Sequence, residues 1–330
     1  MLLGIGVTLF VGLVWMVVGI IYSNATKDKS QFNLFMLNTV IFGAIIAFLL
    51  PYIGSFEVIQ EIIPVKYMPV KPLSKIPWSD LGKLALLTVP SNLSGFAGFF
   101  ILSYAMRMGA HSVAWGIMQS AIVLPFLTGW LILGDNVKAG NLCGMLIIIL
   151  SLVILVCGKV ASTDKSAGKS ENSSNVKNFL IFTFLAFLCT GIQQSCTLLP
   201  NKADIIFPGT EPFTEAVLAW RIPLGSLGSL VIWTIVSLLA KVKFSFGQLK
   251  NSLIYAIVVF SGQTLFYVAV DILSNYKLSG VVYPLAIGCC IVSFSIFCVI
   301  FRNEKLNILE KVGLGVMVLG LCTQAIATVF

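Results

Sequence analysis

Apolar residues along this chain fall into ten long runs, which short polar segments separate. A helix rises about 1.5 Å per residue and the hydrocarbon core of a bilayer is about 30 Å thick, so about 20 apolar residues span it. The runs have this length, and they do not alternate polar and apolar residues as the strands of a membrane barrel do. We therefore predict ten membrane-spanning helices, at residues 2–22, 33–53, 83–106, 111–133, 140–158, 178–198, 213–240, 251–273, 278–301 and 308–328.

The composition agrees with a protein whose main partner is a lipid bilayer. Apolar residues make up 58% of the chain and charged residues 10%, whereas soluble domains carry about 25% charged residues. Because a water-facing surface cannot be built from so few charges, we expect most of the outer surface to face lipid. The first run, 2–22, is longer than the apolar core of a signal peptide, and no basic segment precedes it. We therefore predict a span there rather than a cleaved signal.

One segment differs from the rest in composition and divides the chain. Residues 161–178 are rich in Ser, Asn, Lys and Gly, which predicts a flexible linker between two sets of five spans, 1–160 and 179–330. The segment 54–82 is longer and less polar, and its prolines exclude a continuous helix. We expect it to lie on the membrane surface, with a mobile gate as the alternative.

The distribution of basic residues predicts the orientation. Arg221 lies inside a predicted span. Of the other Lys and Arg residues, thirteen follow spans 1, 3, 5, 7 and 9, and seven follow spans 2, 4, 6 and 8. Because cytoplasmic loops are enriched in basic residues, we place the linker in the cytoplasm and both termini outside, in a bacterial inner membrane. No basic cluster with interleaved aromatic residues occurs, so nucleic acid is not an expected partner.

The two halves align on their last two spans when Gly144 is placed on Gly313. Asp135 then falls on Glu304, at the turn before the last span of each half. We predict structural roles for both carboxylates, as helix caps or partners of loop cations. Each half has an odd number of spans, so the second copy is inverted relative to the first, as in many transporters. The predicted fold is thus an all-α membrane protein of ten helices in two inverted five-helix repeats.

On these features the chain resembles the drug/metabolite transporter superfamily, in its two-repeat form. The resemblance rests on the five-plus-five organisation, the LGD and RNE turns at Asp135 and Glu304, and the glycines Gly144 and Gly313. The segment LSYAMRMGAHSVAWGI is also similar to the junction of spans three and four in the rhamnose- and glucose-uptake branch. That branch resemblance implies uptake of a sugar-like solute together with a proton. Two features depart from the pattern: the first half lacks a counterpart of Arg221, and the early spans lack a deep acidic residue.

Arg221 is the most informative polar residue, because it lies about eight residues into a predicted span. Arginine at the centre of a membrane costs about 2.5–3.5 kcal/mol on insertion scales, so it needs a partner. Pro223 frees a backbone carbonyl one turn earlier, which favours a binding site for an anionic or oxygen-rich solute. A structural ion pair with a carboxylate of another helix is the alternative.

Amide and aromatic side chains inside the spans are the other candidate contacts of a solute. Amides offer donors and acceptors to a polar solute, with hydrogen bonding between helices as the alternative. Aromatic faces stack on the C–H face of a sugar, with packing or interface anchoring as the alternative. The candidates are Asn38, Asn92, Gln119, Gln193, Gln194 and Gln263, together with Trp15, Trp115, Tyr267 and Tyr283.

Three residues are candidates for proton coupling. Asp271 and Glu215 are the carboxylates best placed to load and release a proton, because partial burial of a carboxylate generally disfavours its charged form. Both lie near the ends of spans, where solvated caps are the alternative. His111, the only histidine, starts a span, where a proton relay competes with simple solvent contact.

Prolines are expected to interrupt four spans and to expose cavity-lining backbone, as broken helices do in transporters. They are Pro90, Pro125, Pro223 and Pro284.

No catalytic or metal-binding pattern is visible in the sequence. The eight cysteines occur singly or as the pair Cys289–Cys290, and no phosphate-binding glycine loop, HExxH or GxSxG motif occurs. We therefore expect no enzyme activity, no metal and no cofactor. The predicted function is secondary active transport of a small polar metabolite, a sugar first, coupled to a proton or a sodium ion, in a monomer or homodimer. The alternatives are an exporter of amino acids or other metabolites and, from another class, a membrane-embedded enzyme or accessory protein.

Overall fold

The computed structural model describes residues 2–27, 29–53, 76–108, 111–135, 137–164, 171–242, 248–274, 276, 278–303 and 306–329. All regular secondary structure in this part of the chain is helical, which confirms the predicted all-α class. The unbroken long helices are α1 (Leu2–Ala25), α2 (Lys29–Ile53), α4 (Trp78–Met108), α7 (Ala139–Asp164), α8 (Glu171–Leu198), α12 (Leu249–Ser274), α13 (Ser279–Arg302) and α14 (Ile308–Val329). Two further spans are broken, into α5 (His111–Gln119), η3 (Ser120–Ile122) and α6 (Val123–Leu131), and into α10 (Glu215–Leu218) and α11 (Arg221–Leu239). Between α8 and α10 lie the short η4 (Leu199–Lys202) and α9 (Ala203–Ile206).

Among the described residues, nine helices are long and apolar enough to cross a membrane, and they coincide with nine of the ten predicted spans. The remaining prediction, 140–158, falls in α7, of which Ala139–Leu155 forms a shorter apolar helix. Helices α7 and α8 extend into both ends of the predicted linker, and its centre, 165–170, lies outside the described residues, as does most of the segment 54–82.

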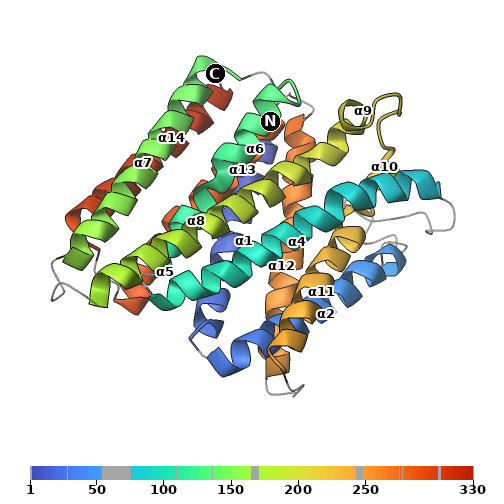
Figure 1. The fold of residues 1–330 in the computed structure, drawn as a ribbon. Helices are drawn as coiled ribbons and strands as arrows, with labels where there is room; N and C mark the ends of the chain where they lie inside the picture. Colours follow the sequence, from blue (N-terminus) through green and yellow to red (C-terminus); the bar gives the residue numbers. More distant parts are fainter. Residues whose placement is uncertain are drawn as a thin grey trace.

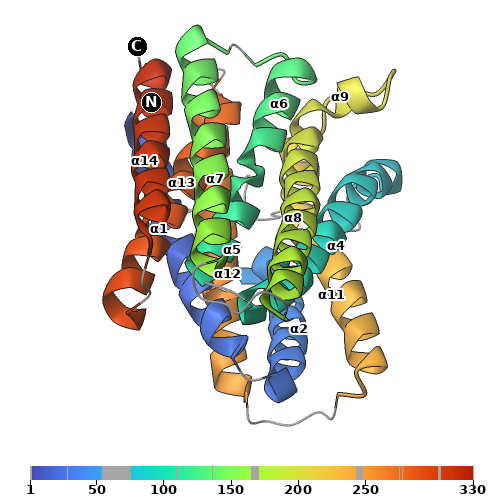
Figure 2. The same cartoon turned by 60° about the vertical axis from the view of Figure 1, so that its left-hand side comes forward.

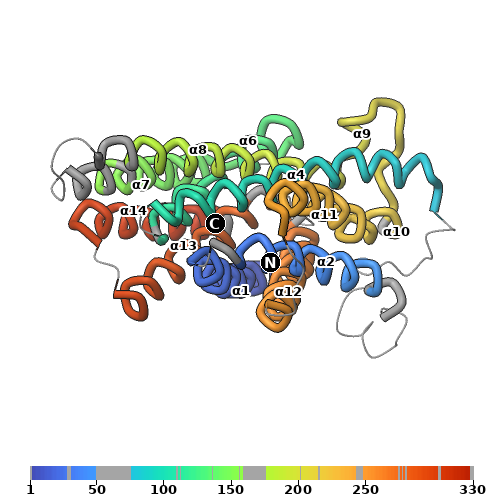
Figure 3. The backbone as a smooth tube through the Cα atoms, turned by 60° about the horizontal axis from the view of Figure 1, so that its bottom comes forward, coloured from blue at the N-terminus to red at the C-terminus, as the bar shows by residue number. Residues whose placement is uncertain are grey.

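The helices form one bundle whose two chain ends lie at the same end (Figures 1 and 2). Helices α7 and α14 pack along each other at one side of it. Among the remaining helices, α4 packs on α8 and α11, α1 packs on α12 and α13, and α2 packs on α11 and α12. Helices α8 and α1 lie on opposite faces of the bundle, each beside a helix from the other half of the chain (Figure 3).

Glycine allows the close approach of α7 and α14. A Cβ atom on Gly144 would lie 3.0 Å from the carbonyl oxygen of Gly320 and 2.7 Å from the side chain of Gln324. A Cβ atom on Gly313 would lie 3.1 Å from the carbonyl oxygen of Ser151 and 2.8 Å from the side chain of Leu155. Backbones this close exclude a side chain, as at other small-residue helix contacts in membranes. The two glycines therefore make the same kind of contact, each with the helix that carries the other.

Two of the four predicted proline breaks are found. Pro125 follows the 3-10 turn at Ser120–Ile122, and Pro223 follows the break between α10 and α11. In each case the proline lacks the N–H that would bond to the carbonyl four residues earlier, and its ring crowds that carbonyl. The prediction was wrong for Pro90 and Pro284, which lie inside the continuous helices α4 and α13. Pro284 lies in the second turn of α13, so few helical bonds precede it.

The turns before the last helix of each half use residues with left-handed backbone. Gly134 has φ 69° after α6, and Asn303 has φ 53° after α13. Glycine and asparagine are the residues that adopt this conformation at the lowest cost, and it ends a helix. The amide of Asp135 then donates to the carbonyl of Gly129 at 3.0 Å, which closes the end of α6. Glu304 lies outside the described residues.

The caps of α7 and α14 come from residues that the sequence analysis did not select. The side chain of Asn141 accepts from the amide of Lys138 at 3.1 Å. At the start of α14, Asn307 and Glu310 form a reciprocal capping box, in which each side chain accepts from the other's backbone amide at 2.7–2.8 Å. These side chains satisfy amides that the first turn of a helix leaves free.

Candidate functional site

A cavity of about 170 Å³ lies within the bundle. Four helices from each half line it: α1, α2, α4 and α5 from the first, and α8, α11, α12 and α13 from the second. None of the described residues of the outer pair α7 and α14 lines it. A volume of about 10–15 Å³ is enough for one water molecule, so this cavity has room for a small solute.

Ten of the eleven predicted solute contacts line this one cavity. They are Trp15, Asn92, Trp115, Gln119, Gln193, Gln194, Arg221, Gln263, Tyr267 and Tyr283. The exception is Asn38, which is buried on α2 and whose Nδ2 has no hydrogen-bond partner among the described residues. The next residue, Thr39, lines the cavity instead, because one residue along a helix turns the side chain by about 100°.

Arg221 is the first residue of α11, directly after the break. Its side chain is 3% exposed, and its Nε donates to the carbonyl of Leu218 at 3.0 Å. The guanidinium carbon lies 4.2 Å from the centroid of the Tyr267 ring on α12, a cation–π contact. Among the described lining residues Arg221 carries the one permanent charge.

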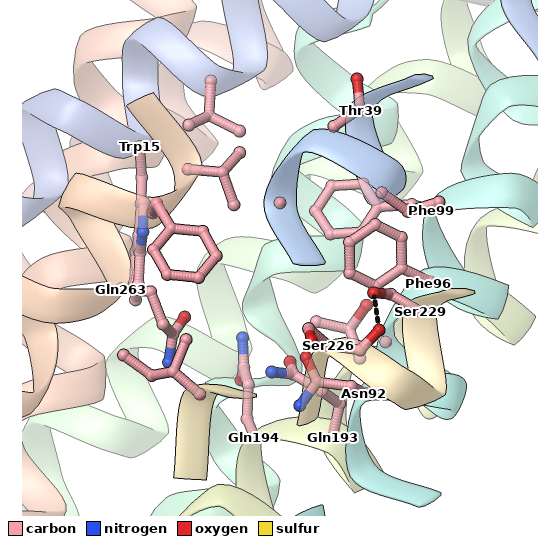
Figure 4. Close-up of a pocket in the computed structure, with 18 of the residues that line it drawn as sticks. Trp15, Thr39, Asn92, Phe96, Phe99, Gln193, Gln194, Ser226, Ser229 and Gln263 are labelled. Atoms are coloured by element: carbon pink, nitrogen blue, oxygen red, sulfur yellow. Dashed lines mark hydrogen bonds between the residues drawn. The ribbon is translucent and has the colours of Figure 1, made fainter. Parts of the chain in front are cut away.

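The amides gather in one part of the cavity (Figure 4). Gln194 lies between Gln263 on one side and Asn92 and Gln193 on the other. The Oε1 atom of Gln194 and the Oγ1 atom of Thr190 are buried without a hydrogen-bond partner in the described part of the chain. An unsatisfied buried polar atom costs about 1–3 kcal/mol, so both atoms favour the binding of a hydrogen-bonding solute or water.

Serines hold the wall formed by α4 and α8. The Ser91 hydroxyl donates to the carbonyl of Gln193 at 2.9 Å, and the Ser94 hydroxyl donates to that of Cys189 at 2.9 Å. Both bonds join the backbones of two different helices through a short side chain. They therefore fix the register that brings Asn92 and Gln193 to the same part of the cavity.

Aromatic rings form much of the remaining lining. Trp15 stacks on Phe266, with ring centroids 5.3 Å apart, and Phe266 packs on Tyr283 at 4.5 Å. Phe96 and Phe99 of α4 form the opposite side, near the serines of α11 (Figure 4). A solute in this cavity therefore meets apolar ring faces as well as amides.

A buried aromatic cluster packs against the cavity lining around Tyr22. The Tyr22 hydroxyl donates to the carbonyl of Phe99, and its ring lies 5.6 Å from that of Phe32, 6.3 Å from that of Trp115 and 6.4 Å from that of Tyr255. Trp115, Tyr255 and Phe99 also line the cavity, so this cluster ties α1, α2, α4, α5 and α12 together beside the site.

Two of the three candidates for proton coupling, Asp271 and His111, are not among the described residues that line the cavity. Asp271 is half-buried on α12, one helical turn after Tyr267. His111 is half-buried at the first residue of α5. The side chain of Glu215 lies outside the described part. Of the carboxylate candidates, Asp271 therefore has a described side chain, and it lies one helical turn from the lining residue Tyr267.

Sequence reasoning missed several lining residues, among them Thr39, Phe96, Phe99, Thr190, Ser226, Ser229 and Tyr255. Hydroxyl residues inside a span were a usable signal for Thr190, Ser226 and Ser229. No comparable signal marked Phe96 and Phe99, because phenylalanine is equally common on lipid-facing and packed helix surfaces.

No family model matches this chain. No curated protein matches it either. Twenty-seven solved chains do, among them one described only as "Crystal structure of protein". That structure has 12% sequence identity and a TM-score of 0.58, over 98% of this chain and 96% of its own. At this identity the likeness shows a shared fold along nearly the whole chain and says nothing about the solute. Within the described residues no group of His, Cys, Asp or Glu is arranged to hold a metal ion.

Proposed function

We propose that this protein is a secondary active transporter of a small polar metabolite and works by alternating access. The observation that carries the proposal is the cavity, which takes four helices from each half of the chain and contains amides, rings and a guanidinium. Polar groups inside a membrane are costly and mark solute pathways. Transporters bind their solute between two repeats, and rocking of one repeat against the other exposes the site to either side.

We further propose that the two halves are inverted repeats. The contacts of Gly144 and Gly313 are related by one interval of 169 residues (313 minus 144). Gly144 contacts Gly320 and Gln324, and Gly313 contacts Ser151 and Leu155, which precede those two residues by the same 169 positions. The left-handed residues Gly134 and Asn303 are separated by the same interval (303 minus 134).

The helix contacts support the same repeat. Helices α4 and α12 are the third spans of the two halves, and α1 and α8 are the first spans. The packing of α4 on α8 therefore corresponds to the packing of α12 on α1. Likewise α4 packs on α11, as α12 packs on α2. If the two inverted repeats exchange their conformations, the protein has two equivalent states, one open to each side of the membrane, as alternating access requires.

The lining favours a solute with several hydrogen-bonding groups, and a sugar is our first candidate. Amides bind hydroxyls, and the rings of Trp15 and Tyr283 offer faces for a sugar ring. Arg221 supports a second candidate, because its guanidinium fits the carboxylate of an amino acid. Proton coupling through Asp271 belongs to the same proposal, since that carboxylate lies one turn from Tyr267.

Membership of the drug/metabolite transporter superfamily is also proposed, on the sequence features described above. The proposed orientation places the segment 161–178 in the cytoplasm of a bacterial cell and both termini outside, following the basic residues. An embedded enzyme is the competing class, and it differs in a measurable way because it would change its solute chemically.

The test is counterflow in vesicles. Purified protein is reconstituted in liposomes preloaded with unlabelled rhamnose, glucose, leucine or phenylalanine, and entry of the same radiolabelled solute is followed. We expect transient accumulation of one of them above the level in empty liposomes, with the recovered label chemically unchanged. Absence of counterflow for all sugars and amino acids tried, or recovery of a chemically altered solute, would count against a transporter. Uptake of a sugar alone favours the first candidate, and uptake of an amino acid alone favours the second.

A further inference from the structure

Three side chains of the cavity rest against glycines of neighbouring helices. Asn92 lies against Gly225 of α11, Gln193 lies against Gly95 of α4, and Trp15 lies against Gly262 of α12. In each pair the side chain lines the cavity and the glycine lines it or lies directly beside it. Figure 4 shows all three side chains at the cavity wall.

The available space at these glycines is smaller than a methyl group. A Cβ atom on Gly95 would lie 2.6 Å from Cγ of Gln193, and one on Gly262 would lie 2.9 Å from Nε1 of Trp15. A Cβ atom on Gly225 would overlap the amide nitrogen of Asn92 and lie 3.2 Å from its Cγ. A side chain at any of these positions therefore has to displace its neighbour, and the open direction is the cavity.

Two of the three contacts occupy corresponding places in the two halves. Gly95 is on the third span of the first half and receives a side chain from α8, the first span of the second half. Gly262 is on the third span of the second half and receives a side chain from α1, the first span of the first half. One glycine therefore holds an amide and the other an indole, so the same scaffold gives the cavity two chemically different walls.

We propose that Gly225, Gly95 and Gly262 are specificity-determining positions of the proposed transport site. Each sets the position of one side chain that faces the solute, and together they set the width of the cavity. The glycines act as positioning residues, because their effect reaches the solute only through Asn92, Gln193 and Trp15. The role in specificity rests on the proposed transport function, whereas the displacement of the side chains can be tested without any solute.

Gly225 gives the sharpest test, because the atom that its Cβ would meet is the end of a flexible side chain. Among the described residues one hydrogen bond holds the Asn92 side chain, from its Nδ2 to the carbonyl of Thr88 at 3.2 Å, so displacing it should leave the fold intact. Gly82 lies on α4, and no atom of the described residues lies within 4 Å of the Cβ that alanine would add there. Gly82→Ala is therefore a matched control for the general effect of adding a methyl group to a helix.

The first experiment measures the position of residue 92 directly. Asn92→Cys is made alone, with Gly225→Ala and with Gly82→Ala, and the purified proteins react with a small methanethiosulfonate reagent. Labelling of the peptide that contains residue 92 is followed by mass spectrometry, so the native cysteines remain. We expect Gly225→Ala to raise the labelling rate several-fold, because the thiol moves into the cavity, and Gly82→Ala to leave it unchanged. An unchanged rate with Gly225→Ala, or the same increase with both, would overturn the proposal.

The second experiment measures specificity, with whichever of the four radiolabelled solutes the parent transports. Gly225→Ala should raise the apparent KM several-fold with little change in maximal rate, and Gly225→Ala combined with Asn92→Ala should behave as Asn92→Ala alone. Additive effects would show that Gly225 acts without Asn92 and would overturn the proposal. If Gly225→Ala yields no folded protein, recovery of folding by Asn92→Ala supports the contact, and its failure contradicts it. If the parent transports none of the solutes, the proposed function fails, while the labelling experiment still decides this inference.

Discussion

The guanidinium of Arg221 lies over the ring of Tyr267, with 4.2 Å between the guanidinium carbon and the ring centroid. The contact joins the first residue of α11 to Tyr267, about two turns before the end of α12, and both residues line the cavity. A guanidinium that stacks on a ring keeps donors at its edge. The stacking therefore holds the Arg221 side chain in place at the cavity wall.

The first prediction concerns this charge. Arg221→Lys should keep the fold and weaken solute binding, because an ammonium lacks the planar donor fork. Arg221→Gln should abolish transport and leave the melting temperature in detergent close to that of the parent. Tyr267→Phe, which keeps the ring beneath the guanidinium, should reduce transport less than either change at Arg221. Melting temperature and solute affinity are the two measurements.

A structural ion pair predicts a different pattern for the same variants. Removing one partner of a buried pair strands the other charge and costs about 3–5 kcal/mol. Arg221→Gln would then unfold at a clearly lower temperature, and neutralising Asp271 or Glu215 in the same protein would restore stability. That result would refute solute binding by Arg221 and identify its partner.

The sequence predicted the helices better than their breaks. Length and hydropathy located nine spans, because crossing a bilayer imposes a length that few other structures share. Proline position alone did not predict breaks, since a proline near the start of a helix, such as Pro284, removes few bonds, whereas Pro223 ends a helix before Arg221. The continuity of α4 through Pro90 was not predictable from the sequence, because it depends on the packing of α4 against α8 and α11.

The candidate site was predictable where the residue type is rare inside a membrane. Arginine and the amides are costly there, so their presence pointed to one polar cavity, and the structure brings ten predicted residues together. The glycine contacts could not be predicted, because Gly225 lies more than a hundred residues from Asn92 and only the fold makes them neighbours.

The second prediction concerns the contact between α7 and α14. Gly144→Val and Gly313→Val should both lower the yield of folded protein, because each adds a side chain where a backbone carbonyl of the other helix already lies. Overpacking of this kind costs about 1–3 kcal/mol or more. Gly315 is two residues from Gly313, and in the described part of the chain no atom lies within 4 Å of the Cβ that a side chain would add there, so Gly315→Val is the matched control. Equal losses for Gly313→Val and Gly315→Val in a fluorescence size-exclusion assay would contradict the packing argument.

A third prediction follows from the aromatic cluster at Tyr22. Tyr22→Phe should lower stability by about 0.5–1.5 kcal/mol, because it removes the bond to the carbonyl of Phe99 and keeps the ring. Tyr22→Ala should cost about 3–5 kcal/mol, since it also leaves a cavity among fully buried rings. Tyr276 is 53% exposed, so Tyr276→Ala serves as control and should have little effect. A thermal unfolding series in which Tyr22→Ala and Tyr276→Ala lose the same stability would exclude a structural role for the cluster.

The last prediction concerns orientation, which no helix contact determines. The thirteen basic residues on the linker side favour the cytoplasm for that side, because translocating short basic loops across the membrane is unfavourable. Single cysteines are placed at Ser173, within the predicted linker 161–178, and at Glu211, in the exposed turn between α9 and α10, in a background without native cysteines. Alternate segments between spans lie on opposite sides of a membrane, so an impermeant thiol reagent added to whole cells should label position 211 and spare position 173. After the cells are opened both positions should react, which shows that the thiol at 173 is chemically accessible. The reverse pattern in whole cells would mean that the orientation is opposite to the predicted one, while the cavity and its helices stay as described. Labelling of both positions before the cells are opened would show that the two segments lie on the same side of the membrane, which contradicts an odd number of spans between them.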